Sequence, residues 1–196
     1  MIDSIAKLKD YIREEAKYYP SQQRIINRIT SLFLTTPISN QYYVWKYIKT
    51  MRYYEFCKNS SFFVVRGGLK LYYAYRLNRY SYKTGFQIAP GSIGKGLKIW
   101  HWGPIIVHSD ARIGKNCTLQ PNIVIGKRKV NGRLPIIGDN VYICSGAKVL
   151  GDIRIGNDVT IAPNTVVFKD VPSNCVVAGN PAVIIKKDGR KVNIPL

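Results

Sequence analysis

The sequence predicts a mainly β fold in its C-terminal half, a coil of stacked triangular turns, with an α-helical region before it. The first observation is an aliphatic residue at every sixth position through much of residues 85–185. The second is a small or aliphatic residue four positions later, and the third is a glycine that often follows directly. A helix needs a period of 3.6 and a hairpin strand a period of 2, so this repeat fits neither alone.

The six-residue series has three runs, separated by one step of eight residues and one of twelve. We expect one aliphatic side chain per flat face to point inward, with small residues and glycines at the corners. Stacked turns then bury a continuous aliphatic column. A β-sandwich with accidental spacing is the disfavoured alternative, because the last run continues over six positions. The series comprises Ile93, Ile99, Ile105, Ile113, Leu119, Ile125, Ile137, Ile143, Val149, Ile155, Ile161 and Val167.

The preceding region is rich in tyrosine, lysine and arginine and has helical apolar spacing. Near its start, Ile5, Leu8 and Ile12 follow Asp3 or Ser4, either of which would cap a helix. Further apolar stretches cover residues 25–33, 42–56 and 68–82. We therefore expect a helical region over 1–84, a β-coil domain over 85–185 and a basic C-terminal tail over 186–196.

The composition favours an anionic partner. The 196 residues include 30 Lys and Arg against 11 Asp and Glu, a formal charge of +19. Such a surface suits a phosphate-rich cofactor, an acidic glycan or an anionic membrane surface. No nucleic-acid-binding motif is present, so we expect no nucleic acid partner. A non-catalytic module that docks through the basic helical region is the alternative from a different class.

The sequence contains no recognisable targeting segment or metal-binding motif. Four widely spaced cysteines form no CxxC pair, so we expect no metal site. No apolar run approaches the ~18 residues of a membrane span, and the first residues have no signal-peptide core. The expectation is a cytoplasmic protein with reduced thiols, with peripheral membrane contact kept open.

A polar, basic excursion interrupts the coil at residues 126–136, GKRKVNGRLPI. Loops that leave a rigid scaffold commonly carry function. The alternative is a tolerated surface insertion.

Four stretches resemble the hexapeptide-repeat acyltransferases, and within them the serine acetyltransferase-like branch. They are IGKGLKIWHWGPIIV (93–107), ARIGKNCTLQPNIVIG (111–126), IIGDNVYICSGAKVLGDIRIGNDVTIAPNTVV (136–167) and DVPSNCVVAGNPAVII (170–185). The resemblance implies a left-handed parallel β-helix, acetyl-CoA as the acyl donor, and a homotrimer with active sites in the grooves between subunits. The helical region is shorter and more basic than that of true serine acetyltransferases, and it resembles the cap of members that modify sugars in capsule or exopolysaccharide synthesis.

His101 matches the catalytic base of this family. It lies two residues past Ile99, at or near a corner and outside the aliphatic column. A histidine can accept the proton of an acceptor hydroxyl as that oxygen attacks the thioester. A corner histidine packed between two tryptophans is the alternative. His108, which no motif explains, is expected to be a loop residue.

Three departures from the serine-specific pattern concern the acceptor. Gln87 stands where the family has a carboxylate that orients the base, so it could select the imidazole tautomer without adding charge. Trp100 replaces an Asp beside the base, and Leu134 replaces a second His in the excursion. We expect Trp100 and Trp102 to stack on a sugar. The predicted acceptor is therefore a carbohydrate hydroxyl in capsule or exopolysaccharide synthesis, as a nucleotide sugar, lipid-linked unit or polymer. The alternative is a serine O-acetyltransferase of cysteine synthesis.

The resemblance also implies where coenzyme A binds. Small corner residues would line the path of the pantetheine and adenine groups, and basic residues would contact its phosphates. The amide of Gly126 or Gly146 could donate to the oxyanion that forms at the thioester carbon. The expected corner residues are Ser145, Gly146, Ala162 and Pro163, and the expected phosphate contacts are Lys127, Arg133, Lys186 and Lys187.

Direct transfer between the two substrates is the expected mechanism. Cys144 is the cysteine closest in sequence to the corner residues, and nothing near it marks an activated thiolate. A β-helical carbonic anhydrase would need three zinc-binding histidines, and the coil contains only His101 and His108.

Overall fold

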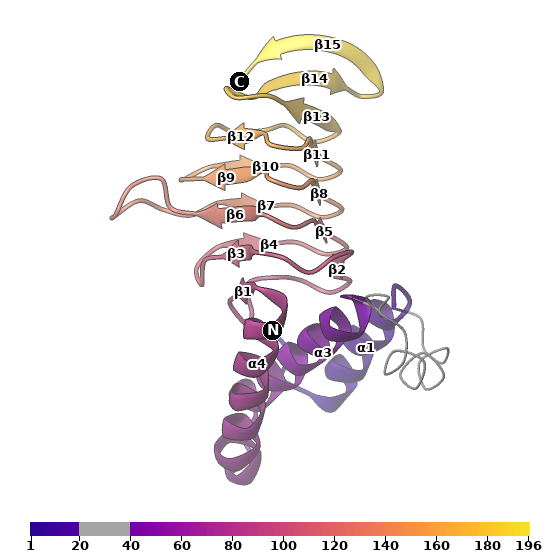
Figure 1. The fold of residues 1–196 in the computed structure, drawn as a ribbon, viewed down its shortest axis with the longest axis vertical. Coiled ribbons are helices and arrows are strands. Elements are labelled where there is room, and N and C mark those ends of the chain that lie inside the picture. The colour runs from indigo at the N-terminus through magenta and orange to yellow at the C-terminus, as the bar shows by residue number, and fades with distance from the viewer. Residues whose placement is uncertain (20–39) are drawn as a thin grey trace, which may run out of the picture. The chain divides into compact units, whose positions relative to one another are not determined.

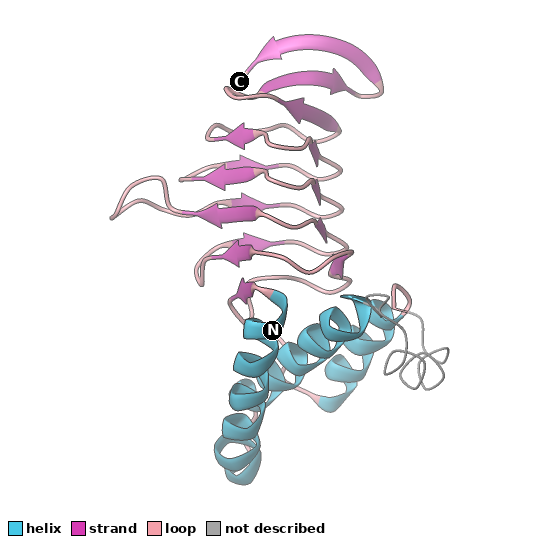
Figure 2. Ribbon diagram, viewed as in Figure 1, coloured by secondary structure: helices cyan, strands magenta, loops and turns pink. Residues whose placement is uncertain are grey.

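The computed structural model describes residues 1–19 and 40–196, in two compact units. Met1–Thr84 and Trp100–Trp102 belong to the first, and Gly85–Ile99 with Gly103–Leu196 to the second. Helices occur in the first unit and strands in the second (Figure 2). The apolar stretch expected over residues 25–33 lies outside the described residues.

The predicted helices near residues 2–12, 42–56 and 68–82 are confirmed. The first begins at Ser4, whose hydroxyl accepts a hydrogen bond of 3.3 Å from the backbone amide of Lys7. No helix in the described part of the chain is both long and apolar enough to cross a membrane. The helical elements are α1 (Ile5–Ala16), α3 (Asn40–Asn59), a π-helical turn (Val65–Leu69) and α4 (Lys70–Thr84).

A buried ion cluster joins α1 to α3. Arg52 is fully buried, and its guanidinium donates to Glu15 at 2.6 Å and to Glu55 at 3.0 Å. Burial opposes the charge of Arg52, yet the two carboxylates raise the pKa of its guanidinium above the ordinary value. The ring of Tyr11 lies 5.0 Å from the same guanidinium. Removing the arginine would leave two buried carboxylates without this partner, so the cluster ties the two helices together.

Three sheets form the three faces of the coil (Figure 1). Within each face, strands from successive turns pair in parallel, as a β-helix requires. One face consists of β1 (Phe86–Ile88), β3 (Ile105–Val107), β6 (Ile123–Gly126), β9 (Lys148–Leu150) and β12 (Val166–Val167), and another of β4 (Arg112–Ile113), β7 (Ile136–Ile137) and β10 (Arg154–Ile155). The third consists of β2 (Lys98–Ile99), β5 (Thr118–Leu119), β8 (Tyr142–Ile143), β11 (Thr160–Ile161) and β13 (Cys175–Ala178).

The third face continues past β13 as an antiparallel extension. Its strands are β14 (Val183–Lys187) and β15 (Arg190–Pro195). The carbonyl of Leu196 then accepts a hydrogen bond from the Lys169 ammonium. The residues expected as a basic tail therefore belong largely to strands.

The aliphatic column is confirmed. All twelve residues of the six-residue series are at most 5% exposed. Register places them on top of one another, as in Leu119, Ile143 and Ile161 on three successive turns. The position four residues later is also buried, at Val141, Ala147, Ile153, Val159 and Thr165. Each turn thus contributes several side chains to one continuous core.

Close stacking at one corner explains the glycines that follow the aliphatic residues. A Cβ on Gly138 would lie 2.9 Å from the carbonyl carbon of Gly156 on the next turn. Beside these glycines, Asn140 adopts a left-handed φ of 58°, and its side-chain Nδ2 donates to the Asp158 carboxylate at 3.0 Å. Asparagine tolerates this conformation better than most residues, so hydrogen-bonded side chains form a ladder along the corner.

We predict that Gly138→Ala lowers the stability of the coil by about 1–3 kcal/mol, because the added methyl must displace the backbone of the next turn. Urea unfolding at fixed protein concentration would measure the change. Gly126→Ala is the matched control, because its Cβ would meet nothing closer than 3.9 Å. Equal unfolding midpoints for the two variants would contradict the stacking argument.

Candidate functional site

His101 lies in an exposed segment between two strands. The chain leaves β2 at Ile99 and enters β3 at Ile105, and His101 is exposed between them. Its neighbours Trp100 and Trp102 are 38% and 42% exposed. The imidazole is therefore outside the aliphatic column. A base must be accessible to its substrate, and the position of His101 meets this requirement. The three residues group with the helical unit.

Gln87 is the exposed central residue of β1. Its neighbours Phe86 and Ile88 are buried, so strand alternation directs the Gln87 side chain away from the core. Gln87 belongs to the coil unit, whereas His101 groups with the helical unit. Their interaction stays a prediction.

His108 is held by its own loop. Its Nδ1 atom accepts from the backbone amide of Asp110 at 3.3 Å and lies 3.4 Å from the Ser109 hydroxyl. The Asp110 carboxylate is 3.9 Å away. These contacts account for His108 as a hydrogen-bonded loop residue.

The basic excursion projects from the coil between β6 and β7 (Figure 1). The guanidinium of Arg128 lies 4.8 Å from the ring centre of Phe168, and Leu134 is buried. Lys127 and Arg133 are both exposed, and Arg133 lies 3.8 Å from the Asp152 carboxylate. The loop is therefore anchored where it leaves the coil, and it presents several cations to solvent, Lys127 and Arg133 among them.

The corner around Ser145 and Gly146 is tightly hydrogen-bonded. The amide of Ser145 donates to the Gln120 side chain at 2.9 Å, and its hydroxyl donates to the Pro121 carbonyl at 3.0 Å. The Gly146 amide also donates to Pro121, at 3.1 Å. The Gly146 N–H is therefore already hydrogen-bonded to a neighbouring turn. The oxyanion donor, Gly126 or Gly146, stays a prediction.

The other residues predicted to bind the cofactor lie on the same unit. Ala162 is half-buried and donates its amide to the Val177 carbonyl at 2.9 Å, and Pro163 beside it is exposed. Lys186 and Lys187 are exposed on β14, where they pair with Lys191 and Arg190 of β15. The antiparallel extension thus gathers four cations, of which the sequence argument used two.

The cysteines are poorly suited to a covalent intermediate. Cys57, Cys117 and Cys175 are buried, and Cys144 is half-buried. Burial raises the pKa of the Cys144 thiol, and it raises that of Cys117 to about 11. Thiolates are therefore disfavoured at neutral pH. Across residues 1–19 and 40–196, no three His, Cys, Asp or Glu side chains gather as metal ligands would.

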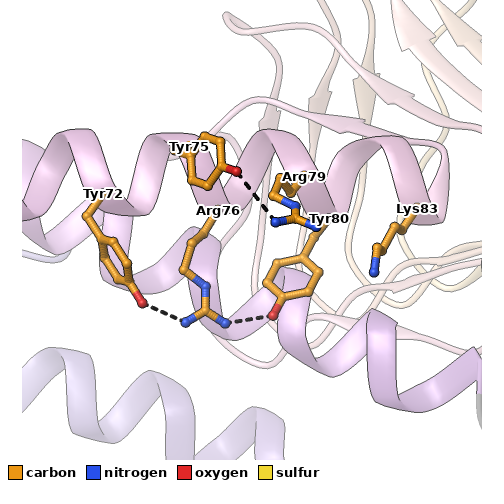
Figure 3. Close-up of a pocket in the computed structure, with 6 residues that line it drawn as sticks. All are labelled: Tyr72, Tyr75, Arg76, Arg79, Tyr80 and Lys83. Carbon is orange, nitrogen blue, oxygen red and sulfur yellow. Dashed lines mark hydrogen bonds between the residues drawn. The ribbon is translucent and has the colours of Figure 1, made fainter.

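A hollow on α4 was not among the predicted sites (Figure 3). The signal that could have found it is the spacing of tyrosines and arginines four residues apart, at Tyr72, Arg76 and Tyr80 and at Tyr75 and Arg79. Its lining residues are Tyr72, Tyr75, Arg76, Arg79, Tyr80 and Lys83.

Comparisons with known proteins support the β-helical fold of the coil. Residues 135–169 match the family described as bacterial transferase hexapeptide (six repeats). The serine acetyltransferase of Staphylococcus xylosus is 39% identical over 112 residues, which cover 56% of this chain and 52% of that protein. The chain thus spans about half the length of that relative.

Solved structures extend the similarity. A serine acetyltransferase from Brucella abortus strain S19 is 27% identical with a TM-score of 0.65, over 93% of this chain and 68% of that one. The coenzyme A complex from the same strain is 26% identical with a TM-score of 0.61, over 93% and 67%. The predicted left-handed β-helix with N-terminal helices is confirmed.

The prediction of a sugar acceptor in polysaccharide synthesis is wrong. The named relatives are serine acetyltransferases, and an alignment over 93% of the chain must include helical residues as well as the coil. The helical region therefore does not separate this chain from those enzymes. The physical reason for the error is that Trp100 and Leu134 lie in loops, whose residues vary more than the scaffold. Leu134 is buried, so its side chain packs against the protein and anchors the excursion.

We predict that the Cys117 thiol makes stability fall in alkaline solution. Its pKa rises from 9.0 to about 11 in the folded chain, so unfolding releases a proton between these values. The stabilisation is complete below pH 9.0 and is lost as the pH rises toward 11. Between neutral pH and about 10.5, the free energy of unfolding of the parent should fall by about 2 kcal/mol more than that of Cys117→Ala. Urea unfolding at each pH would measure this, and equal losses would refute it.

Proposed function

We propose that this chain, whose coil is a hexapeptide-repeat transferase domain, is an acetyl-CoA-dependent serine O-acetyltransferase. The observation that carries the proposal is the 39% identity over 112 residues with the Staphylococcus xylosus serine acetyltransferase. The fold match to the Brucella abortus enzyme supports it independently. The proposed division is a helical region over 1–84, a catalytic coil over 85–185 and a basic terminal segment over 186–196.

His101 is the proposed general base. It would remove the proton of the serine hydroxyl as that oxygen attacks the acetyl carbonyl of the thioester. The new C–O bond forms and the C–S bond breaks, and the proton passes through the imidazole to the departing thiolate of coenzyme A. Its exposure is compatible with this role. The family resemblance, not a measured contact, pairs Gln87 with the base.

Coenzyme A is the proposed donor carrier, and its binding is supported by the Brucella abortus complex. The exposed cations Lys127 and Arg133 on the excursion, with Lys186 and Lys187 on β14, are proposed to contact its phosphates. The corner residues Ser145, Gly146, Ala162 and Pro163 are proposed to line its path, and the Gly126 amide to stabilise the oxyanion. A homotrimer, as the resemblance implies, would form the grooves in which this happens.

We predict that His101→Ala lowers kcat/KM by ~10²–10⁴-fold, the usual contribution of a positioned base. Release of the coenzyme A thiol from acetyl-CoA in the presence of L-serine would measure it. His108→Ala is the matched control and should stay close to the parent, because its contacts lie within its own loop. Activity of His101→Ala within about tenfold of the parent would remove the general-base assignment.

We predict that L-serine is the acceptor. With acetyl-CoA at a fixed concentration, thiol release should depend on L-serine and yield one O-acetylserine per thiol. The physical reason is that direct transfer couples the two products one to one. If hexose acceptors supported faster turnover than L-serine, the proposed function would be wrong while the fold assignment would stand.

A further inference from the structure

We propose that the outer face of α4 and the segment before it form a docking surface for an anionic lipid bilayer. This face, here called the α4 docking face, comprises Phe62, Phe63, Leu71, Tyr75, Arg79, Tyr82 and Lys83. It lies within the helical unit. The proposal goes beyond acetyl transfer and depends on none of the residues assigned to it.

The α4 docking face exposes unusually large apolar side chains. Phe63 is 89% exposed and Phe62 73%, while Leu71 and Tyr82 on α4 are 71% and 92% exposed. Scattered exposed apolar residues are common, but a set of this size on one helix and the segment before it marks an interaction surface.

Helical spacing places the α4 members on one side. Leu71, Tyr75, Arg79 and Tyr82 are separated by four, four and three residues, so they share a face. Leu77 and Thr84 are the buried residues of α4 and lie on the other side. The helix therefore packs through one face and presents aromatic, aliphatic and cationic side chains together on the other.

Two arginines of this helix are held in place by tyrosines (Figure 3). Arg76 donates to the Tyr72 hydroxyl at 2.8 Å and to the Tyr80 hydroxyl at 2.6 Å. Arg79 donates to the Tyr75 hydroxyl at 3.4 Å. A guanidinium already held in one geometry loses less freedom when it meets a phosphate. Arg76, Arg79 and Lys83 line one hollow and could each face a lipid headgroup.

No acidic residue lies near these cations along the sequence. The sequence contains no Asp or Glu between Glu55 and Asp110. A solvated helix normally mixes both signs of charge, whereas α4 carries only Lys and Arg. The resulting field attracts a surface of the opposite sign, and the effect falls off within a Debye length.

A bilayer fits these observations better than two other occupants. A second copy of this chain would bring the same positive face, and the two would repel. A nucleic acid would satisfy the cations but leave Phe62, Phe63 and Leu71 in water. An anionic bilayer accepts both parts, because apolar side chains enter below the headgroups while Lys and Arg meet the phosphates.

Co-sedimentation of the full chain with vesicles tests the proposal. We expect binding to phosphatidylcholine vesicles that contain phosphatidylglycerol, and little binding to phosphatidylcholine alone. Arg79→Gln with Lys83→Gln should weaken binding about 30-fold, because each basic residue near such a surface contributes about fivefold. The matched control is Arg190→Gln with Lys191→Gln, which removes the same charge from exposed β15. An equal loss in this control would overturn the proposal.

A second variant tests the apolar side chains of the α4 docking face. Phe63→Ser with Leu71→Ser should weaken binding at least tenfold, about the burial of a few CH₂ groups, and should remove the fraction that survives high salt. Both side chains are exposed, so circular dichroism should show an unchanged fold. Full binding by this variant, tighter binding to a DNA duplex, or self-association through this face would each refute bilayer docking. Transfer to L-serine in solution should be unchanged, so the two proposals fail separately.

Discussion

The close spacing of successive turns is the constraint on which the coil depends. Parallel strands lie about 4.8 Å apart, so each turn must repeat the path of the one before it. Aliphatic side chains such as Ile143 and Ile161 then stack in one column, and corners such as Gly138 have no room for a Cβ. A scaffold built this way has little freedom to shift. Its irregular parts, the segment around His101 and the excursion at 126–136, are the places where function can vary without loss of the fold.

The same constraint explains how much could be predicted from the sequence. Inward positions recur at a fixed interval, so the column from Ile93 to Val167 is visible without coordinates. The ion cluster of Glu15, Arg52 and Glu55 is not, because its members come from two helices and are up to 40 residues apart along the chain with no repeating pattern. The hydrogen bonds at the corners could not be predicted from the sequence for a similar reason. Only the arrangement of turns shows that the Gly146 amide is already used by Pro121.

The acceptor shows where residue-by-residue reasoning fails. Trp100 and Leu134 replace polar residues of the serine-specific pattern, and these replacements led to the prediction of a sugar acceptor that stacks on Trp100 and Trp102. Leu134 is instead buried at the base of a loop, where an apolar side chain has a packing role. A loop position can thus have a packing role where the related enzymes have a polar residue, whereas His101, the proposed base, is exposed. Departures in loops are weaker indicators of substrate than similarity across the scaffold.

The antiparallel extension at the end of the coil has a consequence for solubility. A parallel coil that simply stopped would leave backbone donors and acceptors open to the first turn of another molecule, and chains could then grow into fibres. On one of the three faces, β14 and β15 reverse the strand direction. The terminal strand carries Arg190, Lys191 and Pro195. Charged side chains and a residue without an N–H make β15 a poor template for strand pairing, so this edge disfavours end-to-end association of coils.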